Sequence, residues 1–246
     1  MGTRIETGFV LSGEVQMFYT VRGKGKPIVL LHGNNQNWQF FEMQIACLEN
    51  IYQVITIDTR GHGKSTNDSK KWSIALMAED VVAVLDFLEI KVATILGFSD
   101  GGNIALQLAI KHPEKLKALV LVSTNINPKG LKLYIRIPMT IIYRLTSRLS
   151  SLSKWINKRA QQYEIMVLEP NFSMQELAEI NIKTLVIAGE HDLIYQKHTE
   201  LIAKSIKNAR LEIIKKTGHF LLKQEYSIVN SIIIDFLLEE EDKEPS

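Results

Sequence analysis

Two patterns of hydrophobic and polar residues alternate along most of the chain. Short, mostly apolar runs, typical of strands buried on both faces, occur at residues 28–31, 53–58, 93–96, 118–122, 184–188 and 211–214. Between them lie segments with apolar residues three and four positions apart, as in amphipathic helices; one runs from the candidate N-cap Ser73 to about Leu88. The alternation predicts an α/β fold with a doubly wound, mostly parallel sheet.

The pattern changes at the start of the chain, at one place inside it, and at its end. Residues 5–21 alternate polar and apolar around a central glycine, which predicts an opening antiparallel hairpin. After the sixth strand, residues 125–181 read as short amphipathic helices and predict a small helical lid. The α/β core is thus expected at 1–124 and 182–238, with a last helix from about Leu221 to Leu238, and 239–246 as a solvated acidic tail.

Composition narrows the class of protein. The chain has 246 residues, of which 46% are hydrophobic and 23% are charged, as in an ordinary globular domain. A net charge of +2 without a known nucleic-acid module argues against nucleic acid as a partner. The one cysteine, Cys47, forms no internal disulfide, and the first residues lack the apolar core of a signal peptide, so we expect a cytoplasmic protein. No obligate protein partner is indicated.

A serine stands where a predicted strand meets a predicted helix. The run Gly97-Phe98-Ser99-Asp100-Gly101 follows the apolar run 93–96 and precedes a helical pattern that ends near Lys111. A serine with a glycine two residues away on each side, at such a corner, is typical of a nucleophile elbow. The pattern alone also fits a plain glycine-rich turn. Whether an acid and a histidine lie near this serine distinguishes a nucleophile elbow from a plain turn.

An acid and a histidine occupy the matching strand ends. A serine hydroxyl becomes a nucleophile when a neutral imidazole takes its proton and a carboxylate orients the imidazole. Asp192 follows the predicted strand 184–188, and His219 follows 211–214, so both are expected at the same sheet edge as Ser99. The order serine, acid, histidine is the one that this architecture uses. Glu190 is a second candidate for the acid, although it lies nearer the strand end.

Other polar residues have simpler interpretations. His32 and His62 are expected to brace loops through their ring nitrogens, and Asp58 to fix the turn that follows it. No pair among the 6 histidines has a convincing metal spacing, so neither a metal nor a cofactor is predicted.

Nearly the whole chain resembles the α/β-hydrolase superfamily. The similarity lies in Leu31-His32-Gly33-Asn34, in Asp58-Thr59-Arg60-Gly61-His62-Gly63-Lys64-Ser65, in Gly97-Phe98-Ser99-Asp100-Gly101-Gly102, in Gly189-Glu190-His191-Asp192 and in Gly218-His219. The resemblance implies that Ser99 is the nucleophile, His219 the general base and Asp192 its orienting acid. It also implies an oxyanion hole made by the backbone N–H groups of Asn34 and Asp100.

The implied activity is that of a serine hydrolase. It would cleave a small carboxylic ester or a thioester through an acyl-enzyme on Ser99. The same triad also serves carbon–carbon bond hydrolases and cofactor-free perhydrolases. A hydrolase-fold ligand sensor with little turnover is an alternative of another class.

Two features bear on what approaches the site. The form Gly-x-Ser-Asp-Gly-Gly resembles the valacyclovir-hydrolase-like branch, in which the acid after the nucleophile receives a substrate ammonium group. This resemblance implies that Asp100 contacts the substrate. We also expect Asn35 and Trp155 near the substrate. From 115 to 163 the chain carries many Lys and Arg residues and no Asp or Glu. Such a basic lid suits anionic substrates or peripheral contact with an acidic membrane, while a solvated cationic helix face is the simpler alternative.

Overall fold

The structure is a computed structural model that describes residues 5–67 and 72–241. Within these residues an eight-stranded sheet has the order β1-β2-β4-β3-β5-β6-β7-β8. The pairs β1–β2 and β2–β4 are antiparallel, and the remaining neighbours are parallel. The strands are β1 (Glu6–Ser12), β2 (Val15–Arg22), β3 (Lys26–Leu31), β4 (Tyr52–Ile57), β5 (Ala93–Phe98), β6 (Leu116–Val122), β7 (Thr184–Gly189) and β8 (Ala209–Ile214). The predicted hairpin and the mostly parallel sheet are confirmed.

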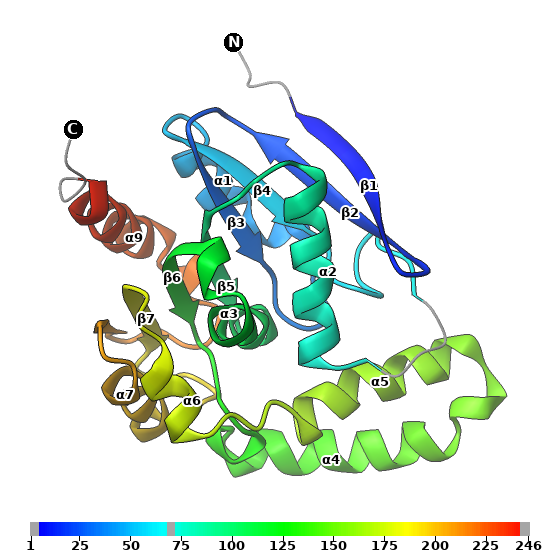
Figure 1. Ribbon diagram of the computed structural model, residues 1–246. Helices are drawn as coiled ribbons and strands as arrows, with labels where there is room; N and C mark the ends of the chain where they lie inside the picture. Colours follow the sequence, from blue (N-terminus) through cyan, green and yellow to red (C-terminus); the bar gives the residue numbers. More distant parts are fainter. Residues whose placement is uncertain (1–4, 68–71, 242–246) are drawn as a thin grey trace.

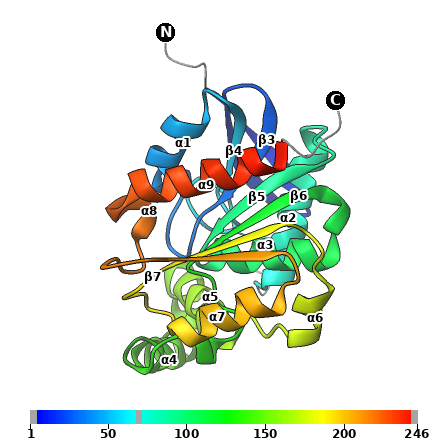
Figure 2. The same cartoon turned by 90° about the vertical axis from the view of Figure 1, so that its left-hand side faces the viewer.

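Helices cover both faces of the sheet (Figures 1 and 2). The α-helices are α1 (Glu42–Leu48), α2 (Ile74–Phe87), α3 (Asp100–Lys111), α4 (Leu133–Arg148), α5 (Lys154–Leu168), α6 (Met174–Glu179), α7 (Gln196–Ser205), α8 (Leu221–Gln224) and α9 (Tyr226–Glu241). On one face α2 and α3 pack with Val29 and Leu31 of β3, and on the other α1, α8 and α9 pack with Ile28 and Leu30. Successive side chains of a strand point to opposite faces, so a strand covered on both sides is apolar throughout.

The segment between β6 and β7 holds α4, α5 and α6, in the interval for which amphipathic helices are predicted. α4 and α5 lie side by side below the carboxyl ends of the parallel strands (Figures 1 and 2). α4 has no buried side chain, whereas α5 buries Ala160 and Ile165. α5 therefore joins the pair to the core, and α4 lies outside it. The boundaries of the core and the action of this segment as a lid stay predictions.

The end of the chain differs from the prediction in two respects. The single helix expected from Leu221 to Leu238 is two helices, because Glu225 has non-helical backbone angles (φ −126, ψ 40). The side-chain amide of buried Gln44 donates to the Leu222 carbonyl oxygen at 2.9 Å, a tertiary hydrogen bond at this break. The expected acidic tail is also wrong at its start, because α9 continues to Glu241 and Glu239 pairs with Lys183 and Arg210. Residues 242–246 lie outside the described residues.

Within residues 5–67 and 72–241, no helix is both long enough and apolar enough to cross a bilayer.

Candidate active site

Ser99 sits at a sharp corner between β5 and α3. Its backbone has φ 53 and ψ −119, in a region that non-glycine residues rarely adopt because the side chain crowds the backbone. The Ser99 N–H donates to the Val122 carbonyl oxygen at 2.9 Å, and the Ser99 carbonyl oxygen accepts from the Gly102 N–H at 2.8 Å. These bonds hold the strained residue in place. The corner has the backbone geometry of the nucleophile elbow that its sequence predicts.

The glycines of the elbow allow the strand and the helix to approach each other. A Cβ atom on Gly97 would lie 2.2 Å from the carbonyl oxygen of Gly101, closer than atoms can pack. A Cβ atom on Gly101 would lie 2.0 Å from the carbonyl oxygen of Leu31, on the neighbouring strand. A side chain at Gly97 would therefore push α3 away from β5, and one at Gly101 would push α3 away from β3.

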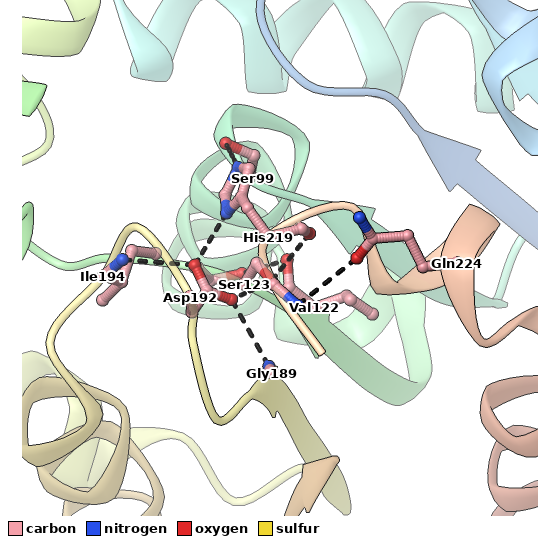
Figure 3. Close-up of polar contacts among 10 residues, drawn as sticks. Ser99, Val122, Ser123, Gly189, Asp192, Ile194, His219 and Gln224 are labelled. Atoms are coloured by element: carbon pink, nitrogen blue, oxygen red, sulfur yellow. Dashed lines mark hydrogen bonds and ion pairs between the residues drawn. The ribbon is translucent and has the colours of Figure 1, made fainter. Parts of the chain in front are cut away.

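Ser99, His219 and Asp192 form one chain of hydrogen bonds (Figure 3). The Ser99 Oγ lies 3.3 Å from His219 Nε2, and His219 Nδ1 lies 2.7 Å from Asp192 Oδ1. An ionised carboxylate only accepts hydrogen bonds, so Nδ1 carries the proton and Nε2 is free to accept the serine proton. The structure thus brings together the three residues that were expected at this edge of the sheet.

The Asp192 carboxylate is almost fully buried, with 2% of its side chain exposed. Burial by itself raises the pKa of Asp192, but the hydrogen bond and charge of His219 and the hydrogen bond from Ser123 outweigh it, and the pKa lies below its ordinary value. The Ile194 N–H also donates to Oδ1, at 3.1 Å. Asp192 therefore stays ionised and keeps His219 in the tautomer that can take a proton.

Ser123 belongs to this site and was not predicted from the sequence. Its hydroxyl donates to Asp192 Oδ2 at 2.5 Å, and its side chain is fully buried (Figure 3). Like Ser99, it directly follows a parallel strand and has a positive φ, of 52. The signal available in the sequence was a small polar residue at the carboxyl end of the apolar run 118–122.

Glu190, the alternative acid, has a different partner. Its carboxylate accepts the backbone N–H of Lys216 at 2.8 Å, and 42% of its side chain is exposed. Asp192 is therefore the carboxylate that contacts His219, and Glu190 closes the loop next to it.

The loop after β3 lies beside the elbow. The side-chain amide of Asn34 donates to Asp100 Oδ2 at 2.9 Å and to the Gln162 carbonyl oxygen on α5 at 3.0 Å. Among the described residues, neither the Asn34 nor the Asp100 backbone N–H has a hydrogen-bond acceptor. Burial raises the pKa of Asp100, and the hydrogen bond from Asn34 offsets part of the rise. Two backbone donors are thus available next to Ser99, one on this loop, which is anchored from two sides, and one at the start of α3.

A small cavity opens between this loop and the helices α4 and α5. Its volume is about 160 Å³, and it is lined by Asn34, Asn35, Met139, Arg159, Gln162, Tyr163 and Met166. Asn35, one of the predicted substrate contacts, also accepts a hydrogen bond from Arg159 at 2.8 Å. Trp155 does not line the cavity, because its side chain is 66% exposed and stacks with Arg159. The structure gives no contact that would support a substrate-binding role for Trp155.

His32 and Asp58 brace the loops around the site, as predicted. His32 Nδ1 donates to the Gly33 carbonyl oxygen at 2.8 Å, and Nε2 accepts the Thr59 N–H at 3.0 Å. The Asp58 carboxylate accepts the N–H groups of Trp38 and Lys64 at 2.7 and 2.8 Å. Both side chains tie the loops after β3 and β4 together.

His62 has the same kind of role. Its ring lies 3.3 Å from the side-chain amide nitrogen of Gln162 and 3.0 Å from the Arg60 carbonyl oxygen. It thus links the loop after β4 to α5. Burial, helped by the neighbouring His32, lowers the pKa of His62 to about 3, so its ring is neutral at physiological pH.

The neutral His32 makes folding stability depend on pH. Burial lowers its pKa from 6.5 to about 4, so between these values the unfolded chain binds more protons than the folded chain. We expect the free energy of unfolding to fall as the pH drops through this window, with His32 contributing about 3 kcal/mol. Urea unfolding at pH 7.5 and pH 4 measures this change in the free energy of unfolding. His32→Gln should lose less stability between the two pH values than the unchanged protein; equal losses would contradict the assignment.

Comparisons with known proteins agree with this geometry. The family model described as alpha/beta hydrolase fold matches residues 26–138. The human serine hydrolase BPHL is 25% identical over 96% of this chain and 88% of its own length. The 2-hydroxymuconate semialdehyde hydrolase of Pseudomonas sp. (strain CF600) is 25% identical over 88% of each chain. The crystal structure of carboxylesterase CesB (YbfK) from Bacillus subtilis has a TM-score of 0.78 and 22% identity over 95% of this chain and 92% of that chain.

The matched residues of the family model include the loop after β3 and the elbow, and the likeness to the solved structure covers 95% of this chain. The sheet order, the elbow and the hydrogen-bonded triad are those that the resemblance implies. The resemblance to the α/β-hydrolase superfamily is therefore confirmed, and the chain is a hydrolase of that fold.

Proposed function

We propose that this chain is a serine hydrolase that cleaves a small carboxylic ester or thioester through an acyl-enzyme on Ser99. The observation that carries the proposal is the hydrogen-bond chain from Ser99 Oγ through His219 to Asp192, at 3.3 and 2.7 Å. A strained serine, a hydrogen-bonded imidazole and a buried ionised carboxylate in this order are the components of nucleophilic acyl transfer.

In the proposed reaction, His219 transfers each proton, and the alcohol or thiol and then the carboxylic acid leave as products. His219 Nε2 takes the hydroxyl proton while Ser99 Oγ attacks the carbonyl carbon, and it then gives this proton to the departing alcohol or thiol. A water molecule next loses a proton to the same nitrogen and attacks the acyl-enzyme. The carboxylic acid leaves, and the serine hydroxyl regains its proton. Asp192 stabilises the imidazolium during both steps.

The backbone N–H groups of Asn34 and Asp100 would stabilise the negative charge that develops on the carbonyl oxygen. Removing one such donor in related systems costs about 3 to 4 kcal/mol of transition-state stabilisation. The Asn34 side chain, held by Asp100 and Gln162, fixes the loop that carries the first donor. We infer that the Asp100 carboxylate mainly anchors this loop, since its own hydrogen bond is already made to Asn34.

A panel of activated esters and thioesters tests the proposal. The panel varies acyl length, charge and α-amino substitution, and Ser99→Ala serves as the blank. We expect Ser99-dependent hydrolysis of short neutral acyl groups, and no strict requirement for an α-ammonium group. If no ester or thioester is cleaved above the blank, the carbon–carbon hydrolase, perhydrolase or ligand-sensor alternatives replace this proposal.

Ser123 provides a test of how Asp192 is positioned. A hydrogen bond to a charged group contributes about 1.5 to 3 kcal/mol, so Ser123→Ala should lower kcat about tenfold to a hundredfold with little change in KM. The loss should fall on kcat, because Ser123 is one of the groups that hold the Asp192 carboxylate in place. An unchanged kcat would show that Ser123 only fills space.

A further inference from the structure

The outer surface of α4 and of the turn into α5 is apolar. α4 has no buried residue, and large apolar side chains remain exposed along it and beyond its end. We define the basic apolar face by Tyr134, Ile137, Ile141, Leu145, Leu152 and Trp155, together with the cations between them. Tyr134 is 63% exposed and Leu152 is 71% exposed. A helix that packs only against its own protein normally turns such residues inward.

The apolar residues of α4 share one side of the helix. Tyr134, Ile141 and Leu145 are separated by seven and four positions, and Ile137 lies three positions after Tyr134, so the four align along the axis. α4 is the outermost helix at the carboxyl edge of the sheet (Figures 1 and 2). The face can therefore meet a flat surface without interference from the core.

Positive charge accompanies this apolar surface. Between residues 115 and 163 the sequence has Lys and Arg residues but no Asp or Glu, although the net charge of the whole chain is only +2. Arg144 and Arg148 are exposed on α4, and Lys154 is exposed at the start of α5. The cations thus stand among the exposed apolar side chains, and no acid of this segment neutralises them.

We propose that the basic apolar face docks on an anionic lipid bilayer. Apolar side chains among arginine and lysine match a surface that has negative headgroups above hydrocarbon, since long basic side chains reach the phosphates while the apolar ones enter the acyl boundary. A second copy of the chain fits poorly, because two such faces would bring like charges together. This docking does not depend on the chemistry of Ser99.

The inner side of α5 connects this face to the reactive site. Arg159 donates to Asn35 at 2.8 Å, and the Gln162 carbonyl oxygen accepts from Asn34 at 3.0 Å. Docking would therefore hold the loop after β3 one helix layer from the lipid. With the proposed function, this geometry favours esters that partition into the bilayer over freely soluble ones.

Vesicle flotation of the full chain tests the docking directly. The vesicles are either phosphatidylcholine alone or phosphatidylcholine with phosphatidylglycerol. We expect the protein to float with the anionic vesicles at low salt, to release at high salt, and to stay unbound with phosphatidylcholine alone. Protein that fails to float with the anionic vesicles overturns the proposal, whatever its esterase activity.

Matched variants separate this face from the rest of the surface. R144Q/R148Q should weaken binding about thirtyfold, because each cation near an anionic surface contributes about fivefold. I141S/L145S should weaken it at least about tenfold through lost apolar burial. K24Q/K91Q makes the same change in net charge at exposed positions before β3 and β5, at the opposite edge, and should bind like the unchanged protein.

Three results would overturn the assignment of this face. In the first, K24Q/K91Q loses as much binding as R144Q/R148Q, which would show that binding depends on the net charge of the whole protein and not on this face. In the second, I141S/L145S binds anionic vesicles like the unchanged protein. In the third, the protein is a dimer without lipid and I141S/L145S is a monomer, so that a second copy covers the face. Urea unfolding of each variant, with a midpoint equal to that of the unchanged protein, shows that the fold is retained.

Discussion

Replacing Ser99 with alanine is expected to lower kcat/KM for ester hydrolysis by about 10⁴-fold to 10⁶-fold. In the proposed mechanism the hydroxyl oxygen forms the acyl-enzyme, and among the described residues it is the Ser99 side chain that lies 3.3 Å from His219 Nε2. The remaining rate would come from the oxyanion donors and from substrate binding. Steady-state kinetics on the best ester of the panel measures the loss.

Ser231→Ala is the control for this substitution. Ser231 is an exposed residue of α9, and its loss should leave the kinetics unchanged. Urea unfolding checks that Ser99→Ala retains the fold. A Ser99→Ala protein that keeps more than about a hundredth of the activity would exclude Ser99 as the nucleophile.

Asp192→Asn is expected to reduce kcat by about 10⁴-fold with a small effect on KM. The asparagine side chain can turn its NH₂ group toward His219 Nδ1, which favours the tautomer with the proton on Nε2. That nitrogen could then no longer take the proton of Ser99. Pre-steady-state kinetics should show that formation of the acyl-enzyme, not substrate binding, has slowed.

Glu190→Gln is the matched control, since Glu190 lies two residues before Asp192 in the same loop and accepts a backbone N–H. It should change kcat less than about tenfold. A larger loss for Glu190→Gln than for Asp192→Asn would show that the glutamate is the orienting acid. Equal small losses would show that His219 needs no carboxylate partner.

Much of the fold and the triad could be predicted because their signals are local. Apolar runs mark strands that are covered on both faces, and the carboxyl ends of parallel strands meet at one edge. Residues that directly follow such runs, as Asp192 and His219 do, therefore come together with Ser99 although they are far apart in the sequence.

Ser123 escaped prediction because its role depends on a hydrogen bond across 69 positions, and its neighbours in the sequence give no sign of that partner. The break between α8 and α9 has the same origin, since Gln44 reaches the Leu222 carbonyl oxygen from another part of the chain. Trp155, a residue of the predicted lid, was expected near the substrate. The spacing of apolar residues in the sequence does not show at which residue of α5 the contacts with the core begin, and the first buried residue is Ala160.

The insertion between β6 and β7 carries two roles on opposite sides. Its inner side, through Arg159 and Gln162, holds the loop that would bind the oxyanion. Its outer side presents the basic apolar face. Substrate selection in this hydrolase is therefore expected to depend on α4 and α5 as much as on the elbow, and variants in the insertion should alter specificity before they alter the chemistry at Ser99.

Covalent labelling with a fluorophosphonate tests the central claim most directly. The probe phosphonylates a serine that is activated by its histidine, and mass spectrometry of the digested protein locates the adduct. We predict one adduct per chain, on Ser99, with labelling strongly slowed in Asp192→Asn and absent in Ser99→Ala. A folded protein that hydrolyses esters but carries no adduct, or carries it on another residue, would contradict the account.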